Sequence, residues 1–310
     1  MKNVLIKALN YGLGSIEKSF LYLLRVSYEV PNIWIIGPPR SGTTLLYQVL
    51  LKRYKFAYIS NFASVFYKAP ILATGIAHIL FNSRDAVIEF ESDYGKTSNW
   101  LGPHEAGAFW YRWFPKGDYV YVPPNALSQN HLKLLKREVI GLGLFMKAPV
   151  LFKNVYNSMR IAPIVETFPN ACFLVCNRDP LDSAQSILNG RAKFYNDKSE
   201  WLSVPPKEVE QIRQHPYWQQ VTEQVYYIYQ QIDEDKQRYG TNRFLEIDYG
   251  QLCKSTHKTL QEIEEFLVEH SIELMAIDDV PEQFPFSTGQ KVNDKDYHRI
   301  REVVTQLWQR

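Results

Sequence analysis

A short segment near the N-terminus limits the possible folds of this 310-residue chain more than any other. Residues 33–36 are all apolar, which predicts a buried strand, and Gly37 with the two prolines after it predicts a turn. An apolar helical pattern follows over residues 43–53. A strand, a tight turn and a helix in this order aim backbone N–H groups and the positive end of a helix dipole at one point. The segment therefore predicts an α/β fold with an anion site after its first strand.

The glycine spacing in this turn makes the anion site more specific. Gly37 and Gly42 have the G-x-x-x-x-G spacing of a phosphate-binding loop. Thr43 stands where a nucleoside triphosphatase carries the lysine that reaches the β- and γ-phosphates, which argues against a kinase, and the cation is Arg40 instead. The alternative is a helix-capping turn with Ser41 or Thr43 as the N-cap.

The residues of the turn resemble the 5′-phosphosulfate loop of the sulfotransferase superfamily, P-[RK]-S-G-T-T-x-L. The matching residues are Pro39, Arg40, Ser41, Gly42, Thr43, Thr44, Leu45 and Leu46. The resemblance implies a P-loop-like fold, with a central, mostly parallel sheet flanked by helices. It also implies the donor 3′-phosphoadenosine 5′-phosphosulfate (PAPS), which leaves as the bisphosphate PAP. Residues 39–45 would bind the 5′ end of the donor, and Arg40 would also stabilise the moving sulfuryl group.

A second segment carries the same resemblance. Residues 173–177 predict a strand, and Arg178 at its carboxyl end can point into the crevice where open α/β sheets bind ligands. The family holds the donor's 3′-phosphate with an R-D-P-x-D-x-x-x-S segment, which this chain matches at Arg178, Asp179, Pro180, Asp182 and Ser186. The resemblance assigns Arg178 and Ser186 to the phosphate. Asp179 is better suited to capping the following helix, because a carboxylate repels a phosphate.

Three further residues are weaker candidates, two of them from weaker matches to the family. Lys153, in a K-x-P-like segment, either helps to bind the sulfate or is a solvated surface lysine. Tyr249, in a segment similar to V-x-Y-E-D-L, either contacts the donor or closes a strand as a half-buried tyrosine. We expect Lys291 in a C-terminal loop that closes over the donor.

The acceptor side offers a candidate base. Pro103-His104-Glu105 precedes an aromatic run at 109–114, whose rings suit stacking on a sugar. The family uses either histidine or glutamate as the base, and this step resembles bacterial glycan-modifying members. We favour Glu105 over His104 and a carbohydrate acceptor. The structural alternative for this segment is a capping glutamate followed by core aromatics. A lipid-like or small phenolic acceptor and a catalytically silent nucleotide-binding protein are the alternatives.

The remaining pattern predicts one domain over residues 1–310, with an acceptor-site insertion at 92–124 and a loop or lid at 196–215. The formal charge of +2 does not indicate nucleic-acid binding. Three cysteines without C-x-x-C spacing predict free thiols and no metal site. The predicted strands are 32–37, 56–60, 150–154, 171–177 and 243–247, and the helices that follow the first strand are 43–53, 158–168, 180–188, 217–239, 256–268 and 297–308.

Two apolar stretches bear on location. Residues 1–30 predict an amphipathic helix whose face at Leu5, Leu9, Leu13, Ile16, Phe20 and Leu24 packs on the domain or, as the alternative, touches a membrane surface. Residues 71–81 predict a buried helix, and no stretch is long enough to span a bilayer. We therefore expect a cytoplasmic protein with peripheral membrane contact as an option. The oligomeric state is not indicated.

Overall fold

The computed structural model describes residues 2–24, 29–81, 90 and 97–309, and it has the expected α/β architecture. Four strands form the central sheet: β1 Asn32–Ile36, β2 Val150–Lys153, β3 Cys172–Asn177 and β4 Phe244–Asp248. All pairings are parallel, and the strand order is β2-β1-β3-β4. After β1 the chain adds β2 on one side, and it then adds β3 and β4 on the other side of β1. The order of the strands therefore reverses between β1 and β3. Open α/β sheets bind ligands at such a point, at the carboxyl ends of their strands.

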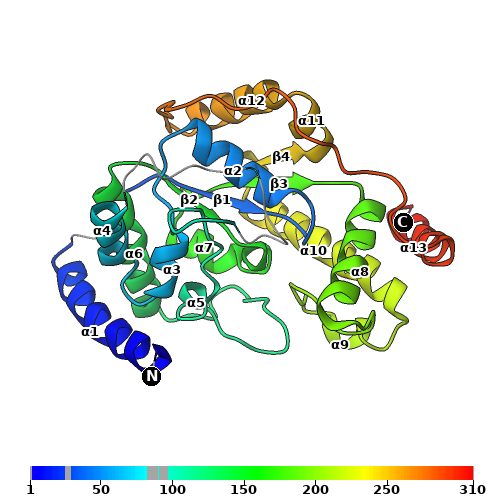
Figure 1. The fold of residues 1–310 in the computed structure, drawn as a ribbon, viewed down its shortest axis with the longest axis horizontal. Coiled ribbons are helices and arrows are strands. Elements are labelled where there is room, and N and C mark those ends of the chain that lie inside the picture. Colours follow the sequence, from blue (N-terminus) through cyan, green and yellow to red (C-terminus); the bar gives the residue numbers. More distant parts are fainter. Residues whose placement is uncertain (1, 25–28, 82–89, 91–96, 310) are drawn as a thin grey trace.

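Helices cover both faces of the sheet (Figure 1). Alternate residues of β1 point to opposite sides, as the pleat requires. Ile33 and Ile35 pack in a core with α2 Thr43–Arg53 and α12 Thr256–Glu269. Trp34 and Ile36 pack in a second core beneath α6 Gln129–Met146, α7 Ile161–Thr167 and α10 Tyr217–Tyr239. Covering both faces explains why these strands read as unbroken apolar runs.

A third layer of helices lies beside α10. The helix α8 Pro180–Tyr195 packs against α10 and the C-terminal helix α13 Asp294–Trp308 through a small apolar core. The remaining elements are short or lie at the N-terminal side: α1 Lys2–Leu23, α3 Asn61–Val65, α4 Pro70–Leu80, α5 Gly107–Trp110, α9 Val209–Ile212, α11 Tyr249–Lys254 and the 3₁₀ turns Val155–Met159 and Thr241–Arg243.

Most predicted elements are confirmed, and the helices at 43–53 and 217–239 have the predicted bounds. The strand predicted at 56–60 is wrong. Ala57 and Ser60 form only isolated bridges, the second of them to Pro103, which has no N–H with which to extend a ladder. The helix predicted at 158–168 divides because Asn154 caps an earlier 3₁₀ turn, accepting from the Tyr156 N–H at 2.9 Å.

The N-terminal helices differ more from expectation. The apolar face of α1 does not pack on the domain: Leu5, Leu9, Ile16 and Phe20 are 63%, 42%, 50% and 63% exposed. Asn10, Glu17 and Leu21 form the buried face instead, and the carboxylate of Glu17 accepts from the Leu72 N–H at 2.8 Å. The helix predicted at 71–81 is only partly buried, because Ile79 and Leu80 at its end are 85% and 62% exposed.

Three further observations bear on the class of protein. Cys172, Cys176 and Cys253 are free and buried, as expected. No group of three potential ligands for a metal ion occurs in the described part of the chain. Within the same residues, each helix is too short or too polar to cross a bilayer.

Candidate active site

The loop after β1 is held in an unusual backbone conformation. Gly37, Arg40 and Gly42 all have positive φ, at 145°, 70° and 98°. A Cβ on Gly37 would lie 2.8 Å from the carbonyl oxygen of Cys176, so only glycine lets this loop approach β3 so closely. The hydroxyl of Ser158 fixes the loop from the other side, at 3.0 Å from both the N and the O of Gly37.

The start of α2 is open to a ligand. Gly42 is its N-cap, and no side chain caps the first turn. The expected alternative, a capping turn made by Ser41 or Thr43, does not occur, because the hydroxyl of Ser41 donates to the carbonyl of Pro38 at 2.8 Å. The first backbone N–H groups of a helix lack intrahelical partners and carry the positive end of its dipole. This turn therefore has the geometry of an anion site.

A cavity of about 650 Å³ opens over this turn. Most of the predicted site residues line it: Pro39, Arg40, Gly42, Thr43, Thr44, Leu45, Glu105, Arg178 and Tyr249. Lys153 lines it as well. Four predicted residues do not line the cavity themselves: Ser41, His104, Ser186 and Lys291. They contact the lining residues or the neighbours of those residues. The cavity thus joins the β1–α2 loop, the end of β3 and the start of α11.

Three cations from distant parts of the chain meet at one side of the cavity. Arg40 donates through Nε to the hydroxyl of Ser186 at 3.0 Å, and Arg178 donates to the carbonyl of Arg40 at 2.9 Å. Burial and the positive charges of Arg178 and Arg40 lower the pKa of Lys291. Charges of one sign held this close favour a bound anion of high charge.

The ring of Tyr249 packs against this cluster. The guanidinium of Arg178 lies 4.6 Å from the centre of its ring, and Nε of Arg178 is buried without a hydrogen-bond partner. A Cβ on Gly42 would lie 2.4 Å from the same ring. Tyr249 is therefore buried, as one reading of the sequence expected, and also lines the cavity. Asp179 caps α8 by accepting from the Asp182 N–H at 3.1 Å, in line with its predicted role.

Lys291 reaches the cluster on the C-terminal strap, which we define as residues 280–292. The amide N–H of Lys291 donates to the side chain of Gln185 in α8 at 2.8 Å, and its ammonium donates to Ser287 at 2.6 Å. The carbonyl of Ser287 in turn accepts from Arg178. The strap thus lies across the start of α8 and completes the cation cluster.

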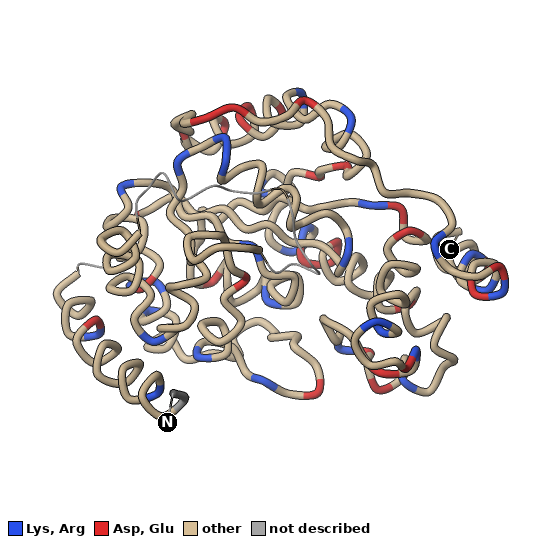
Figure 2. The backbone as a smooth tube through the Cα atoms, in the orientation of Figure 1, with Lys and Arg blue, Asp and Glu red and all other residues tan. Residues whose placement is uncertain are grey.

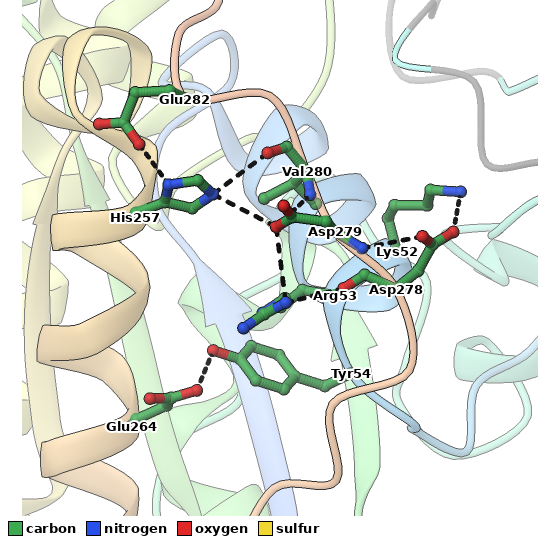
Figure 3. Close-up of polar contacts among 9 residues, drawn as sticks. All are labelled: Lys52, Arg53, Tyr54, His257, Glu264, Asp278, Asp279, Val280 and Glu282. Carbon is green, nitrogen blue, oxygen red and sulfur yellow. Dashed lines mark hydrogen bonds and ion pairs between the residues drawn. The ribbon is translucent and has the colours of Figure 1, made fainter.

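Polar contacts fix the chain where the strap begins (Figure 3). His257 of α12 contacts the carboxylate of Glu282 and lies 3.2 Å from the carbonyl of Val280. Arg53, at the end of α2, donates to the carbonyl of Asp278 at 3.0 Å. His257 therefore helps to fix the start of the strap.

A second charged group lies beside the anion site. Lys153, at the end of β2, is only 3% exposed, which contradicts the surface-lysine reading. Its ammonium donates to the Thr44 hydroxyl at 3.0 Å and to the carboxylate of Glu105. The neighbouring Asn154 holds the backbone carbonyl of Glu105 at 2.9 Å. A buried lysine therefore links the start of α2 to the candidate base.

The geometry separates the two candidate bases. Nδ1 of His104 accepts from the Ala106 N–H at 2.8 Å, so a neutral His104 carries its proton on Nε2 and has no free basic nitrogen. Burial is the main reason that the pKa of His104 is lowered, which keeps the ring neutral. Glu105 lines the cavity, with one carboxylate oxygen in contact with Lys153, whereas His104 does not line it.

The aromatic run expected to stack on a sugar is mostly core. Phe109, Trp110, Trp113 and Phe114 are each at most 7% exposed and belong to the core beneath β1, so this expectation is wrong. The structure describes residues 97–124 of the predicted insertion at 92–124. Of these described residues, only Glu105 lines the cavity. Rings missed in the sequence line it instead: Tyr156, Phe194 and Tyr195.

Comparisons with known proteins identify the family of this chain. Residues 31–270 match the model of a sulfotransferase family. A sulfotransferase STF9 structure from Mycobacterium avium matches with a TM-score of 0.51 and 16% identity over 92% of this chain and 70% of that one, which shows a shared fold. Sulfotransferase STF1 from Mycobacterium tuberculosis H37Rv has a TM-score of 0.47 and 12% identity, over 96% of this chain and 75% of that one. No curated protein sequence matches. Because the family model covers most of the chain, this protein belongs to the sulfotransferase family.

Proposed function

We propose that this sulfotransferase uses PAPS as its donor and transfers the sulfuryl group to a hydroxyl of a carbohydrate. The observation that carries the proposal is the meeting of Arg40, Arg178 and Lys291 beside the uncapped start of α2. A donor with phosphates at both its 5′ and 3′ positions needs two anion sites, and this arrangement offers two. The start of α2 suits the 5′ end, and Arg178 with Ser186 suits the 3′-phosphate.

The residues present fit the donor's chemistry. PAPS supplies a sulfuryl group carried on a phosphate, and its transfer resembles in-line phosphoryl transfer, where positioning and charge stabilisation supply most of the catalysis. Thr43, Thr44 and the first N–H groups of α2 would hold the phosphate. Lys153 touches Thr44 and is buried, so it is placed to stabilise charge at the reacting end. Arg40 contacts Ser186, so it would serve the 3′-phosphate side together with its predicted catalytic role.

Glu105 is the proposed base. Its carboxylate would accept the proton of the acceptor hydroxyl, and the contact with Lys153 fixes the carboxylate beside the donor site. His104 would position the chain, because its ring nitrogen holds the backbone at Ala106 immediately after Glu105.

The acceptor end of the cavity supports the carbohydrate proposal through different rings from those expected. Phe194 and Tyr195 are 43% and 48% exposed at the end of α8, where rings can stack on the apolar face of a sugar. Val155, Ile187 and Leu202 line the same cavity and favour a phenolic or lipid-like acceptor as the second candidate. The three free, buried cysteines support a reducing, cytoplasmic location.

Calorimetry tests the donor. We expect PAP to bind the wild type and ATP to bind far more weakly, because Thr43 replaces the lysine that would hold a γ-phosphate. Arg178→Ala should weaken PAP binding by about 2–4 kcal/mol, since a charged phosphate loses its planar fork. Arg213→Ala, at an exposed ion pair on α9, is the matched control and should bind as the wild type does. Tight binding of ATP without binding of PAP contradicts the proposal.

Transfer of radiolabelled sulfate tests the base and the acceptor. Glu105→Gln should lower kcat about 10²–10⁴-fold on the best substrate of a panel of glycans, phenols and hydroxylated lipids. His104→Ala should have a smaller effect, and Glu210→Gln, an exposed carboxylate on α9, should have none. Undiminished kcat in folded Glu105→Gln would remove this residue as the base. A preference for phenols over every glycan would select the second acceptor class.

A further inference from the structure

The N-terminal helix α1 contacts the rest of the protein along one narrow face. The amide of Asn10 donates to the carbonyl of Val65 at 2.9 Å, and its oxygen accepts from the Lys68 N–H at 3.2 Å. Glu17 and Leu21 complete this face and are buried. Glu17 is the only acidic residue of α1, so the surface that the helix presents outward carries no negative charge.

The outward surface of α1 is apolar to an unusual degree. Its large side chains are exposed: Val4, Leu5, Leu9, Tyr11, Ile16, Phe20, Tyr22 and Leu23 range from 42% to 81%. Ser15 and Ser19 lie among them, and their hydroxyls donate to the carbonyls of Tyr11 and Ser15 at 2.9 and 3.0 Å. Serines that bond back to their own helix hide their polarity and tolerate apolar surroundings. In Figure 2 most of α1 is tan, the colour of residues other than Lys, Arg, Asp and Glu, whereas α13 has both blue and red segments.

Cations line one edge of this surface. Lys18 and Arg137 lie 5.9 and 5.1 Å from the ring centre of Tyr22, and Lys68 lies 3.3 Å from that of Tyr11. These three cations surround a cavity of about 250 Å³ between α1 and α6, and Nε of Arg137 is buried there without a hydrogen-bond partner. Among the described residues, none of the three forms an ion pair with a carboxylate. The glutamate in the cavity wall, Glu138, is paired with Arg112.

We propose that α1 binds an anionic membrane surface, with its apolar side chains in the interfacial layer and the three cations against lipid phosphates. An apolar surface that lacks negative charge and is bordered by basic residues is what interfacial helices present to lipid. A second copy of the chain suits the surface less well, because a two-fold contact across α1 would bring two cationic edges together. The inference does not depend on the proposed acceptor or donor.

Sedimentation with vesicles tests the proposal. The full chain is mixed with vesicles of neutral phosphatidylcholine alone or with about one third of anionic phosphatidylglycerol added. We expect the protein to pellet with the anionic vesicles and to be released by high salt. Leu9→Glu and Phe20→Glu should each weaken partitioning about tenfold or more, because an exposed apolar side chain that would enter the lipid is replaced by a charge. Val268→Glu, at an equally exposed apolar residue on α12, is the matched control and should pellet like the wild type.

The outcomes separate the possible occupants of this surface. Circular dichroism and PAP binding show whether each variant is folded, and the variants are expected to match the wild type in both. Lys18→Glu should reduce binding to anionic vesicles while leaving the apolar surface intact. Equal pelleting with and without vesicles, or pelleting unaffected by Leu9→Glu and Phe20→Glu, overturns the proposal. Light scattering that shows a dimer converted to a monomer by Phe20→Glu overturns it as well, in favour of a second copy.

Discussion

Single residues set the geometry of the anion site, and Gly42 is the clearest example. It is the N-cap of α2, its φ of 98° is strained for any other residue, and its α-carbon faces the ring of Tyr249. Because the same ring lies beneath Arg178, the glycine also determines how closely the loop approaches the cation cluster. One small residue thus sets the distance between the two proposed phosphate sites.

Gly42→Ala should therefore damage both stability and donor binding. The added methyl group would lie 2.4 Å from the Tyr249 ring. Overpacking and the strained φ together should lower the free energy of unfolding by about 2–4 kcal/mol. The control is Gly107→Ala, where a Cβ meets no atom within 4 Å. Urea unfolding and PAP calorimetry of both variants check this, and equal stability of the two contradicts it.

The residues of the site were predictable where they lie in one contiguous segment. The loop at 37–45 and Arg178 with Ser186 are such segments, because a strand end fixes where the next few side chains go. The pairing of Lys153 with Glu105 was not predictable, since β2 and the segment before α5 meet only in the folded chain. The rings at 109–114 misled because the core uses aromatic side chains as readily as a sugar site does.

At the scale of elements, α1 shows what a periodic pattern of apolar residues cannot predict. Its apolar stripe was predicted correctly, but a stripe indicates an apolar environment without saying which one. The protein-facing side of α1 is held by Asn10 and Glu17, whose polar bonds to α4 and the segment before it leave no periodic signal. The strands and long helices, by contrast, pack mainly through apolar residues that recur with the period of the element, so their pattern predicts their position well.

Glu17 makes the docking of α1 dependent on pH. Burial raises its pKa to about 7 from the ordinary value of 4.5, so the folded protein binds this proton more tightly than the unfolded chain does. Stability from this group is therefore complete below about pH 4.5 and falls as the pH rises toward 7. Glu17→Gln should reduce that loss by about 1–2 kcal/mol between pH 5 and pH 8.

Urea unfolding at the two pH values measures this difference. Glu302→Gln, an exposed residue on α13, is the control and should keep the wild-type dependence. Glu138 also has a pKa raised to about 7 by burial, so part of the loss should remain in Glu17→Gln. An unchanged difference between pH 5 and pH 8 in Glu17→Gln would show that the carboxyl of Glu17 does not titrate on unfolding.

At the scale of the whole molecule, the proposed donor site is made from segments that lie far apart in the sequence. The strand order places the loop after β1 next to the end of β3, and the strap brings Lys291 from near the C-terminus to the same place. Without an anion, the three cations repel one another. A bound bisphosphate reverses that repulsion and should draw the strap, α8 and the β1–α2 loop together.

PAP should therefore stabilise the strap as well as the loop. At a hundredfold excess over Kd, mass action predicts a gain of about 2.7 kcal/mol in unfolding free energy. Hydrogen exchange should slow at residues 37–45 and at 286–291 together, because Lys291 and Arg178 connect the two segments through Ser287. Lys291→Ala should abolish the slowing at 286–291 and weaken PAP binding about tenfold, whereas Lys295→Ala, in the first turn of α13, should do neither. Protection confined to the loop would mean that the strap contacts the site without sensing the ligand, and Arg40 and Arg178 would then hold the donor alone.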